Sequence, residues 1–174
     1  MLVILSLTRL MPHPVNFSPM AAIALFAGAF IPVSSMRYLV VFVIAVMSDL
    51  LVNSILYGYN DLSYPFQSGS MVIYGTYLLI TWIGSTTRSI SLKSIGIRSI
   101  SASAIFFLTS NFMVWLEGSM YPQTISGLGA CYLAAVPFIQ NSVAGDLFFT
   151  ATIFGIHHFA QQKYPLLLPQ KSSK

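Results

Sequence analysis

The stretch Pro12-His13-Pro14-Val15-Asn16-Phe17-Ser18-Pro19 holds three prolines in eight residues, and apolar sequence lies on both sides of it. Proline has no backbone N–H and disfavours helix at the residue before it. The stretch therefore predicts that one helix ends here and that another begins near Pro19, because proline suits the first turn of a helix. Irregular backbone at membrane depth is tolerated only where protein covers it or where it lines a wet cavity. This break is thus the first candidate for a binding site.

The composition indicates a membrane protein. The chain has 174 residues, of which 56% are hydrophobic and 7% charged, and its mean hydropathy is +0.77; a soluble domain has roughly 25% charged residues. Long uncharged runs favour helices over the strands of an outer-membrane barrel. We therefore expect an all-α integral membrane protein, with about six transmembrane helices in one compact bundle and a proline-rich break after the first helix. The helical transmembrane domain should cover residues 1–160, and residues 161–174 should form a short cytoplasmic tail.

Seven apolar stretches are expected to form the bundle. In chain order they are Met1 to Met11, Pro19 to Val33, Tyr38 to Leu56, Met71 to Ser85, Ile100 to Leu116, a short helix after Thr124, and Asn141 to Phe159. The first is too short to span a bilayer alone, and Pro137 is expected to separate the last two. Ala24 and Gly28 lie four residues apart on one helical face, which predicts close packing against another helix.

The basic residues set the expected orientation. Arg37, the loop with Arg88, Lys93 and Arg98, and the C-terminal lysines all fall on one side when six spans are counted. The positive-inside rule then predicts that both termini are cytoplasmic and that the proline stretch faces outward. Positive charge of this kind does not indicate nucleic-acid binding. No basic residue precedes the apolar run of Met1 to Leu7, which argues against a cleaved secretory signal.

Polar residues inside the apolar runs are the candidates for function. Asp49 lies in the third run with Asn53 one turn later, and an ionisable residue within a span is a functional candidate by default. The alternative is that Asp49 only pairs with Arg9 to fix helix packing. Asn111 and Trp115 share one face of a later run and could form the wall of a pocket, although tryptophan is also common at membrane interfaces and asparagine often joins helices.

Two further positions complete the candidate site. Asp146 lies near the start of the last run and could continue a polar face toward His157, or it could only favour the start of a helix. His13 lies between two prolines in the break, where it could contact a ligand. We therefore expect a substrate site in the outer half of the bundle, formed by Arg9, His13, Asn16, Asp49, Asn53, Asn111, Trp115 and Asp146. The sequence has no motif typical of an enzyme, a cofactor site or a metal site.

Several motifs together resemble a known family. They are Arg9-Leu10-Met11-Pro12-His13-Pro14, Ser48-Asp49-Leu50-Leu51, Asn111-Phe112-Met113-Val114-Trp115, Tyr121-Pro122 and Gly145-Asp146. Their order and spacing resemble an uncharacterised family of bacterial membrane transport proteins, which in turn is similar to the S components of energy-coupling factor transporters. This resemblance implies a six-helix bundle with an outward pocket for a small solute, in the bacterial inner membrane, that works with a transmembrane coupling subunit and ATPases.

Three hypotheses follow from the sequence. The first is an S-component-like transport protein that binds a small polar or amphipathic solute without covalent chemistry. The second is a structural or accessory transmembrane subunit of a larger membrane complex, for which the many aromatic residues and the Ala/Gly face would supply contacts to lipids and to partner helices. The third, ranked last, is a membrane enzyme with Asp49 and Asp146 as a carboxylate pair.

Overall fold

A computed structural model describes residues 1–87 and 90–164 of the chain. It has six α-helices, and the described part contains no strand, so the fold is all-α as the sequence predicts. Their bounds are α1 Leu2–Ser6, α2 Met20–Phe30, α3 Ser34–Leu56, α4 Ser68–Ser85, α5 Leu92–Glu117 and α6 Ile125–Lys163. Two short 3₁₀ helices, η1 Leu7–Leu10 and η2 Tyr64–Phe66, extend α1 and precede α4.

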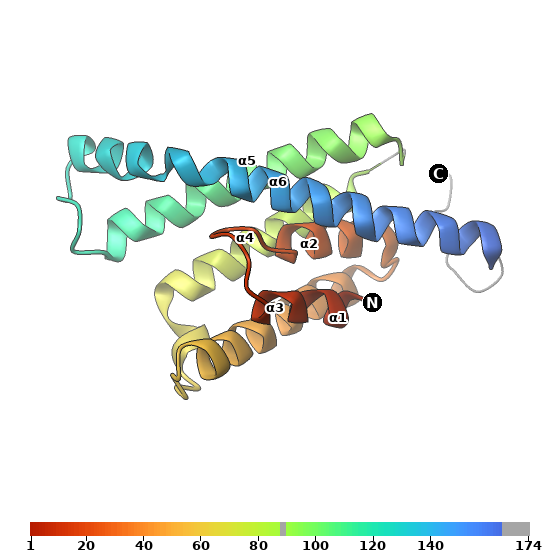
Figure 1. The fold of residues 1–174 in the computed structure, drawn as a ribbon, viewed down its shortest axis with the longest axis horizontal. Coiled ribbons are helices and arrows are strands. Elements are labelled where there is room, and N and C mark those ends of the chain that lie inside the picture. The colour runs from red at the N-terminus through yellow and green to blue at the C-terminus, as the bar shows by residue number, and fades with distance from the viewer. Residues whose placement is uncertain (88–89, 165–174) are drawn as a thin grey trace.

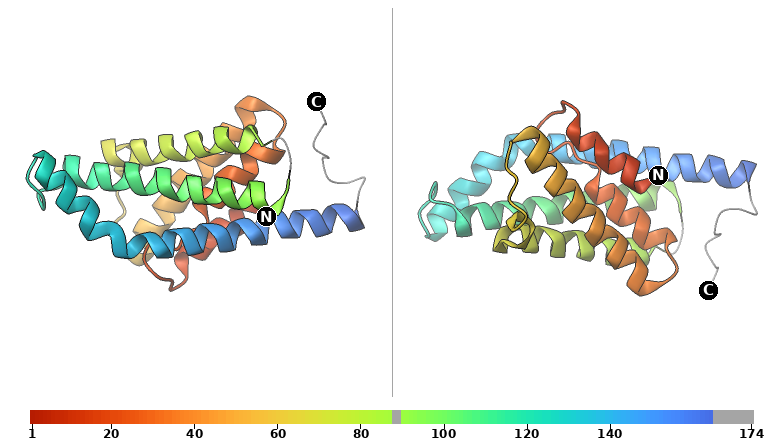
Figure 2. Two further views of the ribbon diagram at one scale, coloured as in Figure 1. Left: turned by 90° about the horizontal axis from the view of Figure 1, so that it is seen from above. Right: turned by 90° about the horizontal axis from the view of Figure 1, so that it is seen from below.

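The four long helices α3 to α6 run alternately up and down the bundle (Figures 1 and 2). Two of them begin at a side-chain cap: Ser91 Oγ accepts the N–H of Ser94 at 3.1 Å before α5, and Thr124 Oγ1 accepts the N–H of Gly127 at 3.1 Å before α6. Such caps satisfy backbone donors that the first helical turn leaves unpaired.

The alternating direction of the four long helices decides which connections lie together. The α3–α4 and α5–α6 connections share one end of the bundle, and the start of α3 and the α4–α5 connection share the other.

The short helix α2 lies in the centre and packs against α3, α4, α5 and α6. Every residue from Met20 to Gly28 is buried. Its small residues make this possible, because a Cβ added at Gly28 would lie 2.0 Å from the carbonyl oxygen of Thr81, and one added at Gly84 would lie 2.3 Å from that of Leu25. The backbones of α2 and α4 thus touch, with Gly28 at the contact and Ala24 fully buried one turn earlier.

The proline stretch is non-helical, as the sequence predicts. Helix η1 ends at Leu10, and α2 begins at Met20 with Pro19 as its N-cap. Between them Asn16 has a φ of 66°, a left-handed conformation that asparagine tolerates better than most residues. Phe17 holds the segment to α6, where its ring lies 5.8 Å from that of Phe148 and 5.3 Å from that of Phe149.

Three expected boundaries are wrong. Helix α6 continues through Pro137 without the predicted break, because a proline inside a long packed helix removes one hydrogen bond and bends the helix rather than ending it; Figure 2 shows α6 bent in its first half. Helix α5 begins at Leu92, so Lys93 and Arg98 lie in a helix and not in a linker. Helix α6 extends to Lys163, beyond the expected end of the last run at Phe159. Arg88 and the tail from residue 165 onward lie outside the described residues.

Charge is distributed unevenly along the bundle. Four basic residues lie near the end of the bundle that holds the α4–α5 connection. They are Arg37 near the start of α3, Lys93 and Arg98 near the start of α5, and Lys163 at the end of α6. Asp61 and Glu117 lie at the opposite end, in the α3–α4 connection and at the end of α5. We call these the basic end and the acidic end.

Two helices, α3 and α5, are long and apolar enough to cross a membrane, with mean hydropathies of 2.4 and 1.5 over their most apolar stretches. Most residues of each stretch are at least partly exposed, since only 28% and 22% of them are buried. These two helices are the evidence for membrane association.

Candidate functional site

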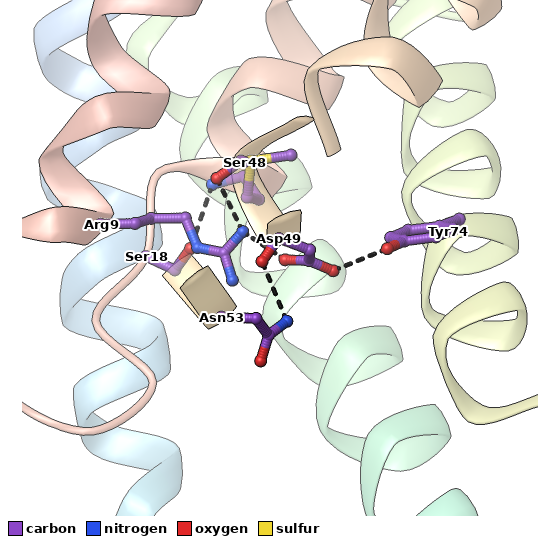
Figure 3. Close-up of polar contacts among 7 residues, drawn as sticks. Arg9, Ser18, Ser48, Asp49, Asn53 and Tyr74 are labelled. Carbon is purple, nitrogen blue, oxygen red and sulfur yellow. Dashed lines mark hydrogen bonds and ion pairs between the residues drawn. The ribbon is translucent and has the colours of Figure 1, made fainter. Parts of the chain in front are cut away.

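An ion pair between Arg9 and Asp49 connects the N-terminal segment to the bundle (Figure 3). Arg9 Nη1 donates to Asp49 Oδ1 at 2.6 Å and to Ser48 Oγ at 2.8 Å, while the Tyr74 hydroxyl donates to Asp49 Oδ2 at 2.9 Å. Three elements, η1, α3 and α4, therefore meet at one carboxylate. The Arg9 and Asp49 side chains are 20% and 16% exposed, so the pair is partly open to its surroundings.

A cleft of about 590 Å³ begins at this ion pair and opens toward the acidic end. Arg9 and Asp49 line it together with Tyr77 and with residues from the start of α4 and the second half of α5. Its aromatic walls are Tyr64, Tyr77 and Phe106, and its hydrogen-bonding groups include Gln67, Ser70, Ser110 and Glu117. Mostly apolar walls with a few converging polar groups are typical of small-molecule sites, and the volume lies in their usual range.

A second cleft of about 430 Å³ lies on the other side of Arg9, beneath the proline stretch. Pro12, His13, Val15, Asn16 and Ser18 line it, so the break in the backbone does border a cavity. Both clefts share Arg9, Tyr77 and Phe106, which therefore form the wall between them. Tyr77 and Phe106 are stacked there, with ring centroids 5.7 Å apart and an interplanar angle of 13°.

Four of the eight predicted site residues line these clefts: Arg9, His13, Asn16 and Asp49. His13 is exposed, and its Nδ1 lies 2.9 Å from the carbonyl oxygen of Pro14. Asn53 is adjacent but turned back on its own helix, where Nδ2 donates to the carbonyl oxygen of Asp49 at 2.9 Å.

The other three predicted residues lie elsewhere. Asn111 Nδ2 donates to the carbonyl of Phe107 at 2.8 Å, and Trp115 Nε1 donates to that of Pro122 at 2.9 Å, so both stabilise α5 and its turn into α6. Asp146 is 6% exposed and lines neither cleft. The predicted convergence of these three residues on Asp49 is wrong, because the cleft faces the side of α5 that carries Ser110, Met113 and Val114.

Asp146 belongs to a separate buried cluster between α5 and α6. Its Oδ2 accepts the hydroxyl of Ser103 at 2.6 Å, and Ser99 and Thr150 lie 3.3 Å apart within the same interface. Asp146 and Asp49 thus have different surroundings, and the geometry offers no support for a carboxylate pair of the kind an enzyme would use.

Sequence reasoning missed Tyr77, Phe106, Gln67 and Glu117. The two aromatic residues carry no signal that separates them from core residues, and they matter because their rings divide two clefts. Glu117 lies just beyond the expected run of Ile100 to Leu116, and it accepts a hydrogen bond from Ser68 Oγ that joins the end of α5 to the start of α4. Glu117 also lines the larger cleft.

Comparison with protein families matches residues 1–168 to a family described as "Family of unknown function (DUF6580)". Comparisons with curated proteins and with solved structures gave no match. The family match extends over the N-terminal segment, the clefts and all six helices. The chain therefore belongs to the DUF6580 family of unknown function.

Proposed function

We propose that the protein is an integral membrane transport protein, similar to an S component, that binds a small solute in the clefts around Arg9 and Asp49. The observation that carries the proposal is the ion pair in the wall of the larger cleft, whose Arg9 also lines the smaller cleft beside it. A charged pair within an apolar bundle is costly unless it has a role or a partner. Here each partner keeps an exposed edge that a solute could reach.

The distribution of charge supports the proposed orientation. The basic end is the cytoplasmic end under the positive-inside rule, which places the α3–α4 and α5–α6 connections outside. The larger cleft then opens to the exterior, as uptake requires. Both described ends of the chain, Met1 and the end of α6, lie toward the cytoplasm in this arrangement (Figure 1). The membrane is proposed to be the bacterial inner membrane, with a coupling subunit and ATPases as partners.

The lining of the larger cleft suggests how a solute is held. Tyr64, Tyr77 and Phe106 supply aromatic faces, and Gln67, Ser70 and Ser110 supply donors and acceptors. Arg9 and Asp49 offset each other in charge, and Glu117 adds one negative charge at the rim. Binding in this cleft needs no covalent chemistry.

The test is whether purified protein retains a solute. The protein would be extracted from membranes in mild detergent and denatured, and the released small molecules would be identified by mass spectrometry. Ser110→Leu fills the larger cleft from α5, and Asp49→Asn removes its carboxylate, so both variants should lose the solute. Ala104→Leu is the matched control, because Ala104 lies on the exposed side of the same helix. Equal retention by all variants, or no specific solute in the wild type, would reject the proposal.

The same preparation tests the alternative of an accessory subunit. The first half of α6 exposes large apolar side chains, with Leu133 74% and Val136 53% exposed, and these could contact lipid or a partner helix. An accessory subunit would copurify with one large assembly and would release no solute. A transport protein would release the solute whether or not partners are attached.

A further inference from the structure

A groove of about 550 Å³ lies at the basic end, between the end of α4 and the start of α5, whereas the larger solute cleft opens at the opposite end of the bundle. Lys93 and Arg98 line it together with three hydroxyl residues, Ser91, Ser94 and Ser101. We propose that this groove binds the phosphate of an anionic lipid headgroup. The inference uses the membrane placement of α5 from the proposed function, but it does not depend on the solute clefts.

Arg98 supplies a fixed positive charge at one side of the groove. Its Nη1 donates to the carbonyl oxygen of Ile83 at 2.7 Å and to Thr86 Oγ1 at 2.9 Å, and its Nη2 donates to the carbonyl oxygen of Thr86 at 3.2 Å. These contacts hold the guanidinium against the last carbonyls of α4. The side chain is thereby positioned before any ligand arrives, which lowers the entropic cost of binding.

Lys93 supplies the second charge and has no acidic partner among the residues that the structure describes. The chain has four acidic residues. Asp61 and Glu117 lie at the acidic end, Asp49 is paired with Arg9, and Asp146 is buried against Ser103. The groove thus presents uncompensated positive charge, and basic pockets between helices on the cytoplasmic side are the sites where anionic headgroups bind.

The apolar surface around the groove favours a lipid over free phosphate. Ile97 lines the groove and is 55% exposed, and Ile100, one turn farther into the membrane on α5, is 50% exposed. Trp82, next to Ile83 on α4, is also 55% exposed, and exposed tryptophan is typical of the headgroup level of a bilayer. A lipid could place its phosphate against Lys93 and its acyl chains along Ile97 and Ile100. Free phosphate would leave this apolar surface unused.

Native mass spectrometry of the detergent-purified protein can test the proposal. The protein would be titrated with dioleoylphosphatidylglycerol, with dioleoylphosphatidylcholine and, in a third arm, with inorganic phosphate. We expect the anionic lipid to bind most tightly and Lys93→Gln to weaken it about fivefold, because one lysine near an anionic headgroup contributes about that factor. Lys163→Gln is the matched control, since it removes a charge from the same end but outside the groove. Arg98 is left unchanged because it caps α4.

Each outcome is decisive. Equal binding of the two lipids by the wild type, or equal binding of the anionic lipid by Lys93→Gln and Lys163→Gln, would overturn the proposal. Displacement of the lipid by inorganic phosphate at matched concentration would assign the groove to free phosphate and overturn the lipid assignment. Lys93→Gln should still retain the solute, and Ser110→Leu should still bind the lipid, so failure of one proposal is distinguishable from failure of the other.

Discussion

The ion pair between Arg9 and Asp49 should contribute measurably to stability as a pair. Breaking a buried pair costs about 3–5 kcal/mol, whereas exposed pairs contribute about 0–1 kcal/mol. With side chains 20% and 16% exposed and a 2.6 Å contact, this pair lies between the two cases. We therefore expect Arg9→Gln and Asp49→Asn each to lower the free energy of unfolding by about 2 kcal/mol. Each variant leaves one charge facing the bundle without its partner.

The double variant should be far less unstable than the sum of the two single variants. The glutamine can still donate to the asparagine, and the asparagine oxygen can still accept the hydroxyl of Tyr74, so no charge is left unpaired. We expect a coupling energy of about 1.5–2 kcal/mol, measured by unfolding in mixed micelles of maltoside detergent and SDS. Arg37→Gln is the control for a simple loss of positive charge, since Arg37 donates to the backbone carbonyls of Gly28 and Pro32. Additivity within about 0.5 kcal/mol would refute the reasoning.

Three other predictions concern packing, a buried hydrogen bond and a titration. Gly28→Ala should lower the unfolding midpoint, because its Cβ would meet a backbone carbonyl of α4 at 2.0 Å, whereas Gly75→Ala, which meets nothing within 4 Å, should not. Ser103→Ala should cost about 1–3 kcal/mol in the same unfolding assay, since it removes the hydroxyl donor of a buried carboxylate in α6. The pKa of Asp61 lies below its usual value because the hydroxyl and the backbone N–H of Ser63 donate to it. The hydrogen bonds from Ser63 to the ionised Asp61 are therefore fully formed above the usual pKa of an aspartate, and they are lost as the pH falls through the lowered pKa of Asp61. Ser63→Ala should raise the pKa of Asp61, as measured by NMR titration.

The sequence predicted the parts of the fold that depend on local chemistry. Three prolines in eight residues interrupt the backbone between Leu10 and Met20, because proline removes donors wherever it stands. The pairing of Arg9 with Asp49, given as the structural alternative, is present. Because only 7% of the residues are charged, few side chains could neutralise Asp49.

The sequence does not show which residues of a helix face the cleft and which face away from it. Asn111 and Ser110 are neighbours on α5, and a small rotation of the helix decides which of them faces the cleft. The predicted residue faces away and bonds its own backbone, while Ser110 lines the cleft. The hydrophobic pattern cannot settle this rotation, because α5 is apolar on nearly all sides. Four of the eight predicted residues thus line the clefts, and those predicted on α5 and α6 do not.

If the bundle spans a membrane as proposed, helix lengths explain how the N-terminal segment would fit. At 1.5 Å per residue, the 11 residues of α2 reach about 16 Å, roughly half of the hydrocarbon thickness, whereas the 23 residues of α3 reach about 34 Å. Helices α1 and α2 run in opposite directions on either side of the proline stretch (Figure 1). They would therefore form a hairpin that enters from the cytoplasmic end, turns within the membrane and occupies the place of the first two expected spans. The non-helical turn at that depth requires cover or a wet cavity, and here Phe17 packs on α6 while His13 and Asn16 line a cleft. In the proposed placement, the protein cover and the cleft that let this turn lie within the membrane are also what would let it take part in a binding site.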